Sequence, residues 1–244
     1  MNALDNFLFG LYPYICLTVF FVGSLLRFDR DQYTWKSDSS QLLKTGQLRW
    51  GSNLFHIGVL FLFFGHFFGM LTPHFVYEHF IGAGAKQLMA MVSGGIAGLL
   101  GFIGLTILLN RRLSEPRIRA TSKTSDIVLL VLLWLQLALG LATLPLSAQH
   151  LDGSMMMKLA EWAQRIVTLR SGAPELLAGA NWIFKAHMFL GMSIFLIFPF
   201  TRLVHVWSGF GAAAYLLRPY QVVRARRLNL PVGHNQAPRP GAGV

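Results

Sequence analysis

Five long apolar stretches run through the 244-residue chain and restrict it to folds that a lipid bilayer can hold. A helix needs roughly 20 predominantly apolar residues to cross a bilayer. Because lipid offers no partner to backbone polar groups, stretches of this kind cross it as helices. We therefore predict an all-α integral membrane protein, a bundle of five transmembrane helices. The stretches lie at about 7–26, 50–72, 87–110, 126–146 and 182–207.

The composition agrees with this class and excludes others. Charged residues make up 13% of the chain, about half the fraction usual in soluble domains. The net charge of +11 does not indicate a nucleic-acid binder, because long uncharged runs interrupt the basic residues. The single cysteine, Cys16, lies in the first apolar stretch, which excludes a disulfide framework and a Cys-ligated metal site. A metal would have to be held by His, carboxylate or Met.

The basic residues gather in every second connection and thereby orient the helices. Segment 27–49, segment 111–124 and the tail after residue 207 each contain five Lys or Arg. Lys and Arg are enriched in cytoplasmic connections. We therefore predict that the N-terminus lies outside and the C-terminus in the cytoplasm. The connections on the opposite side contain Lys86, Lys158, Arg165 and Arg170.

The same pattern predicts the domain organisation. We expect residues 1–207 to form the membrane domain and residues 208–244 a basic cytoplasmic tail with a disordered end rich in Pro and Gly. No cytoplasmic connection is long enough for a catalytic domain, so a substrate-converting domain would belong to another chain. In the long outer connection, Asp152 caps a predicted helix whose apolar positions include Trp162 and Ile166. We expect this helix to lie on the outer membrane interface.

Four of the eight histidines lie inside the apolar stretches, where an ionisable side chain needs a function or a bonding partner. The second stretch contains His56 and His66, and the fifth contains His187 and His205. If these two helices are neighbours, they are antiparallel, so His66 faces His187 near the outer side and His56 faces His205 near the cytoplasm. The alternative is that each is a packed imidazole bonded to a nearby helix. We expect the others to be surface residues: His74, His79, His150 and His234.

Two facing histidine pairs at two depths are typical of two b-type haems, whose irons take axial imidazoles. Iron with two such ligands carries electrons and does not activate oxygen. The spacing is uneven, because ten residues separate His56 from His66 and eighteen separate His187 from His205. These intervals span about 15 Å and about 27 Å of helix, and the shorter one turns the side chain by about 80°. We expect a kink at Pro199 to absorb part of the mismatch.

Two arginines are candidates for binding haem propionates. Arg112 and Arg202 stand near the cytoplasmic ends of the third and fifth stretches. Their guanidinium groups match the geometry of carboxylates. The alternative for both is a charge that snorkels to the membrane surface.

Several longer runs carry a family resemblance. They are Asn53-Leu-Phe-His56-Ile-Gly, Gly65-His66-Phe-Phe-Gly-Met-Leu-Thr-Pro-His74, Arg111-Arg112-Leu, Pro116-Arg117-Ile-Arg119-Ala-Thr, Ser147-Ala-Gln-His150-Leu-Asp-Gly, Phe198-Pro-Phe and Arg202-Leu-Val-His205. With these runs the chain resembles the gamma subunit of membrane-bound respiratory nitrate reductase. The resemblance extends to about Arg227, and residues 228–244 lie beyond it.

The resemblance implies a function. A gamma subunit of this kind is a cytochrome b in the bacterial inner membrane that oxidises quinol and passes electrons to a cytoplasmic iron–sulfur (beta) subunit. That subunit supplies a molybdenum (alpha) subunit, which reduces nitrate. The resemblance also implies that the four histidines ligate two haems and that quinol is oxidised near the outer one. Lys86 and His66 are then the candidate quinol-binding residues, with snorkelling as the alternative for Lys86.

Other functions fit the sequence less well. A stand-alone carrier of the cytochrome b561 kind also uses paired histidines, but does not need three basic cytoplasmic segments that fit docking to an acidic partner. A histidine-lined metal or proton transporter would need carboxylates within the membrane, and the interiors of the five stretches contain neither Asp nor Glu. A purely structural anchor leaves the four histidines unexplained.

Overall fold

The structure is a computed structural model that describes residues 3–31 and 45–208. The described residues belong to one compact unit, Met1–Ser208. The predicted tail lies outside the described residues except for Ser208, and so do Lys36, Lys44 and His234. The domain boundary at residue 207 therefore stays a prediction.

Five long helical segments form the unit, and strands are absent from the described residues. This confirms the all-α class and the five candidate membrane spans, while the orientation of the termini stays a prediction. The first span consists of α1 (Ala3–Asn6), the π-helical turn η1 (Phe7–Leu11) and α2 (Tyr12–Asp31). The next three are α3 (Thr45–Leu71), α5 (Ala83–Ser114) and α7 (Thr124–Ser147). The fifth begins with α9 (Trp182–Ile197).

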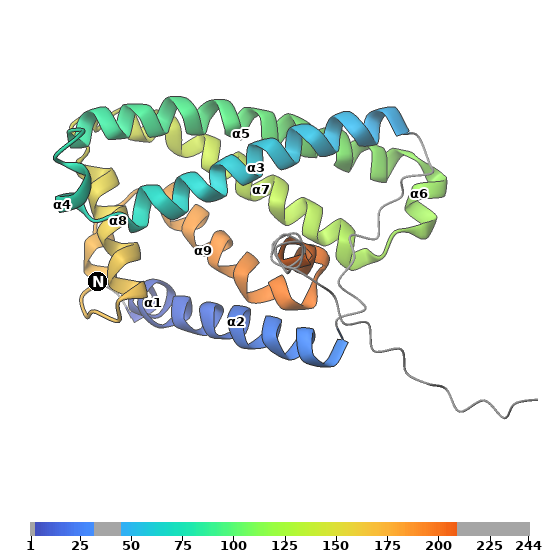
Figure 1. The fold of residues 1–244 in the computed structure, drawn as a ribbon, viewed down its shortest axis with the longest axis horizontal. Helices are drawn as coiled ribbons and strands as arrows, with labels where there is room; N and C mark the ends of the chain where they lie inside the picture. The colour runs from blue at the N-terminus through green and yellow to red at the C-terminus, as the bar shows by residue number, and fades with distance from the viewer. Residues whose placement is uncertain (1–2, 32–44, 209–244) are drawn as a thin grey trace, which may run out of the picture. The chain divides into compact units, whose positions relative to one another are not determined.

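The spans pack in an order that differs from their order in the chain. Helix α3 packs along α5, α5 on α7, α7 on α9, and α9 on α2 (Figure 1). Two short helices lie at opposite ends of the bundle: α6 (Pro116–Thr121) at one end and α8 (Ser154–Val167) at the other (Figure 1). We call these the α6 end and the α8 end. The α8 end also contains α4 (His74–Tyr77) and the 3-10 turn η3 (Pro174–Leu177).

Glycines let α3 and α5 approach each other closely. A Cβ atom added at Gly58 would lie 2.5 Å from the carbonyl oxygen of Ala97, and one added at Gly104 would overlap the backbone nitrogen of Phe55. No real side chain tolerates such distances, so only glycine permits this contact. Small residues at helix contacts are the usual means of tight packing in a membrane.

Helix α8 confirms the helix predicted in the long connection before the fifth span, while its location on the outer membrane interface stays a prediction. Trp162 and Ile166 are buried in a core cluster together with Phe9, Ala173 and Leu177. The indole Nε1 of Trp162 donates to the carbonyl oxygen of Phe9 at 3.0 Å. A buried tryptophan needs such a partner for its N–H. Protein therefore covers the apolar face of α8.

The fifth span is broken at Pro199, where the sequence predicts a kink. Helix α9 ends at Ile197 and is followed by the 3-10 turns η4 (Phe198–Phe200) and η5 (Arg202–Val204). Thr201 between them is extended, with φ −115° and ψ 177°. Pro199 causes the break, because proline lacks the N–H that would continue the helix and its ring clashes with the preceding turn. A helical turn resumes at His205.

Candidate haem-binding site

The structure brings together the two histidine pairs that the sequence predicted. The ring centroids of His56 and His205 are 6.3 Å apart, near the α6 end. Those of His66 and His187 are 6.2 Å apart, near the α8 end. With metal–nitrogen bonds of about 2.0–2.1 Å, two imidazoles on one metal ion have their ring centres roughly 6 Å apart. Both pairs therefore fit a shared iron.

Hydrogen bonds to the backbone fix three of the four rings. The ring nitrogen Nδ1 of His56 donates to the carbonyl oxygen of Ser52 at 2.7 Å. His66 Nδ1 donates to Leu62 O at 2.8 Å, and His205 Nδ1 donates to Arg202 O at 2.6 Å. A carbonyl can only accept, so Nδ1 carries the proton and Nε2 keeps its lone pair. This is how metal-binding histidines are commonly oriented.

His187 is held differently, by close packing against α7. A Cβ added at Gly140 would lie 3.0 Å from His187 Cε1. The buried Nδ1 of His187 has no hydrogen-bond partner among the described residues, and neither has the buried Oε1 of Gln136. The Nε2 atoms of Gln136 and His187 are 3.5 Å apart. Buried polar atoms without hydrogen-bond partners are rare in proteins, and they often mark a functional site or a place where a further group binds.

Arg112 and Arg202 meet at the α6 end around one carboxylate. Asp126 Oδ2 lies 3.5 Å from Arg112 Nη1 and 3.8 Å from Arg202 Nη1. Arg112 is buried and also donates to the Ser122 hydroxyl at 3.2 Å. Two guanidinium groups and one carboxylate give these three side chains a net charge of +1, which suits an anionic group nearby. Sequence reasoning missed Asp126, although an acidic residue in the first turn of a helix is a known stabilising position.

Lys86 is buried at the α8 end, at the beginning of α5. Its Nζ atom has no hydrogen-bond partner among the described residues. It lies 3.4 Å from the centroid of the Tyr77 ring, in cation–π geometry. The side-chain amide of the neighbouring Gln87 donates at 2.7 Å to the carbonyl oxygens of Ser147 and His150, and it thereby caps the end of α7. Lys86 thus has donors to offer, whereas those of Gln87 are engaged.

The other candidates divide between surface and interior. His74, His79 and His150 are exposed, as predicted. In the basic segment 111–124, Arg117, Arg119 and Lys123 are exposed, but Arg111 and Arg112 are buried. The surface of this segment that could receive a partner is therefore smaller than the sequence indicated.

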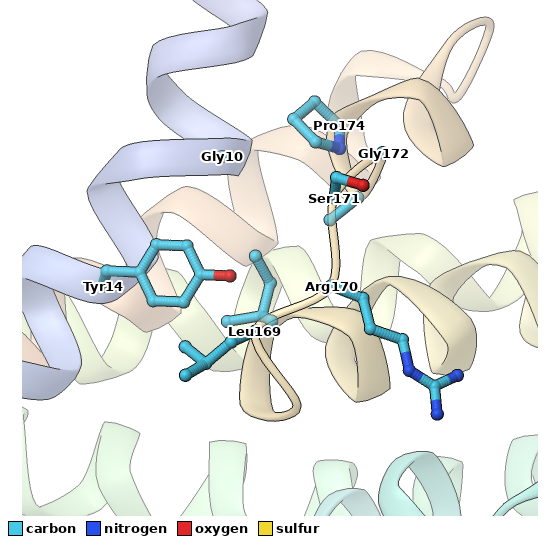
Figure 2. Close-up of a pocket in the computed structure, with 9 residues that line it drawn as sticks. Gly10, Tyr14, Leu169, Arg170, Ser171, Gly172 and Pro174 are labelled. Atoms are coloured by element: carbon cyan, nitrogen blue, oxygen red, sulfur yellow. The ribbon is translucent and has the colours of Figure 1, made fainter.

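A pocket of about 270 Å³ at the α8 end contains none of the predicted site residues (Figure 2). It lies between the first span and the segment that follows α8, and Arg170 points away from the hydroxyl of Tyr14 (Figure 2). In the described part of the chain, no three side chains of His, Cys, Asp or Glu converge as a metal site would require. A haem needs only two protein ligands for its iron, so the histidine pairs fit it without such a cluster.

Comparison with known proteins decides the family. A family model described as nitrate reductase gamma subunit matches residues 5–226. The chain belongs to the nitrate reductase gamma subunit family. The respiratory nitrate reductase 2 gamma chain of Escherichia coli (strain K12) is 58% identical over 228 residues, which cover 93% of this chain and 100% of that protein. The respiratory nitrate reductase 1 gamma chain of the same organism is 54% identical over 226 residues, with the same coverage of both chains.

A more distant relative extends the family beyond that organism. The nitrate reductase gamma chain of Bacillus subtilis (strain 168) is 39% identical over 220 residues, covering 90% of this chain and 97% of that protein. As a gamma subunit with five apolar helices, the protein is a multi-pass membrane subunit of an oxidoreductase complex.

Proposed function

We propose that this gamma subunit is the dihaem cytochrome b of a respiratory nitrate reductase. It oxidises quinol at the α8 end and passes electrons along the bundle to the α6 end. There they enter a cytoplasmic iron–sulfur (beta) subunit and continue to a molybdenum (alpha) subunit that reduces nitrate. The observation that carries the proposal is the pair of facing imidazole couples, 6.2 Å and 6.3 Å between ring centroids, on the same two spans.

The chain's part in electron transfer is to hold four imidazoles in place. Haem, when bound, supplies the one-electron chemistry, and iron with two imidazole ligands has no open position for oxygen. His56, His66 and His205 present Nε2 because Nδ1 is bonded to a carbonyl. His187 presents its ring because the Gly140 backbone lies against it. Rings fixed in this way would not have to reorganise when an electron reaches the haem that they hold.

Lys86 is the principal quinol-binding residue in this proposal. Its buried ammonium has no oxygen partner among the described residues. A buried donor without a hydrogen bond costs free energy, and a quinol or quinone oxygen that accepts from Lys86 would remove this cost. His66 shares in quinol binding only if its Nδ1–H exchanges the Leu62 carbonyl for the quinol, because that hydrogen bond is already made at 2.8 Å. The two electrons go inward, and the two protons are released at the α8 end.

The orientation of the bundle gives this arrangement its energetic consequence. We place the α8 end outside and the α6 end in the cytoplasm, because segment 111–124 and the described parts of segment 27–49, residues 27–31 and 45–49, lie at the α6 end (Figure 1). Each electron that crosses inward without its proton then moves against the inside-negative membrane potential, at a cost of about 2.3 kcal/mol per 100 mV. Outer oxidation therefore makes the subunit a generator of membrane potential, which inner oxidation would not.

At the α6 end, Arg112 and Arg202 would bind the propionates of the inner haem. Asp126 neutralises one of the two guanidinium charges, and the remaining charge attracts a propionate. The exposed Arg117 and Arg119 of α6 contact the beta subunit. Lipid surrounds the outer faces of the spans.

Spectroscopy of the purified full chain tests the proposal. We expect two haems per chain in a pyridine haemochrome assay, both reduced by a short-chain quinol analogue. A chain that carries no haem would overturn the proposal. Two haems that a quinol cannot reduce would leave electron transfer but refute quinol oxidation by this subunit.

A further inference from the structure

The break in the fifth span lies against the first span, and one arginine joins the two. Arg27, in α2, donates from Nη1 to the carbonyl oxygen of Pro199 at 2.6 Å and to that of Thr201 at 2.9 Å. Both carbonyls belong to the interrupted segment between α9 and the turn at His205. A backbone carbonyl that has lost its helix partner is costly in lipid unless another group bonds to it. A charged donor makes the stronger kind of hydrogen bond.

Two further contacts show that the first span is shaped to fit the break. A Cβ added at Gly23 would lie 2.9 Å from the Pro199 ring, so the helix backbone touches the proline directly. One residue later, the Ser24 hydroxyl accepts a hydrogen bond from Trp207 Nε1 at 3.3 Å. Gly23, Ser24 and Arg27 thus follow one face of α2 along the broken segment.

The broken segment in turn carries the ligand of the inner pair. The carbonyl oxygen of Arg202 accepts the hydrogen bond from His205 Nδ1 at 2.6 Å. Arg202 follows directly on Thr201, whose carbonyl Arg27 holds. The direction of the His205 ring is therefore tied, through two backbone units, to a side chain on another span.

We propose that Arg27 is a positioning residue for the inner haem: by bonding the Pro199 and Thr201 carbonyls it sets the direction of His205 and of Arg202. The inference rests on the proposed function, since it assumes that His56 and His205 ligate a haem. It also explains how one chain reconciles the unequal intervals of ten and eighteen residues between its histidines. The break changes the direction of the fifth span between His187 and His205, and the two hydrogen bonds from Arg27 fix the new direction.

The test compares three variants of the full chain in membranes. Arg27→Gln removes the charged donor, and Arg27→Lys keeps the charge but offers an ammonium in place of the planar guanidinium. Arg30→Gln is the matched control, because Arg30 is an exposed arginine on the same helix and its substitution removes the same charge. The readouts are haem content, the electron paramagnetic resonance signal of each low-spin haem, and a redox titration of each haem. His187→Leu and His205→Leu assign the two signals.

We expect Arg27→Gln to lose at least half of the inner haem or to shift its resonance signal and midpoint potential, while the outer haem keeps its own. Arg27→Lys should lie between Arg27→Gln and the unsubstituted chain. Arg30→Gln should match the unsubstituted chain. The inference is overturned if Arg27→Gln leaves both haems unchanged, if it weakens both equally, or if Arg30→Gln has the same effect.

An unsubstituted chain without haem would refute the proposed function, and a second measurement keeps the inference testable in that case. Backbone hydrogen exchange over residues 200–205 should be faster in Arg27→Gln than in Arg30→Gln. Equal rates would show that Arg27 does not hold the break.

Discussion

The contact between Gly140 and His187 makes a quantitative prediction for the outer of the two proposed haems. A methyl group at position 140 would stand 3.0 Å from His187 Cε1 and 3.6 Å from its Nδ1. Carbon atoms in favourable contact are about 3.5–4.0 Å apart, so the ring has to retreat by about 0.5–1 Å. Functional groups generally have to be held within about 0.5 Å of their productive positions. Gly140→Ala therefore moves His187 to or beyond this tolerance.

Resonance spectra and redox titrations of the two haems measure the effect. We expect Gly140→Ala to change the signal and midpoint potential of the outer haem, and Gly140→Leu to remove that haem, leaving about half of the total. The inner haem is an internal reference in the same molecule. Gly94→Ala is the matched control, because a Cβ there meets nothing within 4 Å. Two unchanged haem signals in Gly140→Leu would refute the role of Gly140 in placing His187.

Three further predictions concern other parts of the site and the fold. Substituting His66 or His187 by Leu should remove the same haem, as seen in the spectrum of each variant, and loss of different haems would refute the pairing. Trp162→Phe leaves the buried Phe9 carbonyl without its donor, which costs about 1–3 kcal/mol; thermal denaturation should show a lower Tm, with both haems still bound. Lys86→Gln should slow haem reduction by a quinol analogue without changing the haem content, and an unaltered rate would exclude Lys86 from the quinol site.

The spans and the histidine pairs could be predicted because both follow from intervals along the chain. Apolar length identifies a membrane helix irrespective of its neighbours. The alternation of basic connections makes the second and fifth spans antiparallel, and, once the two helices are taken as neighbours, this matches His56 with His205 and His66 with His187. The break at Pro199 was also predictable, because proline disrupts a helix through its own covalent structure.

Features that depend on contacts between distant segments could not be predicted. Amphipathic spacing showed that one face of α8 is apolar, but not that Phe9, about 150 residues away, would cover it. Arg27 was counted only as a charge that orients the first span, since nothing in its local sequence indicates the carbonyls of Pro199 and Thr201. Asp126 was overlooked for the same reason: its two arginine partners come from other spans.

The contact between the first and fifth spans can form only late in the synthesis of the chain. Arg27 and Pro199 are 172 residues apart, and Tyr12 and Ser193, whose hydroxyls are 2.9 Å apart, are separated by 181. A ribosome that adds about 5–20 residues per second needs roughly 10–35 s to cover such a distance. During this time the first helix is already in the bilayer without its final neighbour. His187 and His205 emerge at the end of the same interval, so under the proposed function neither haem can acquire its second axial ligand until most of the chain has been made.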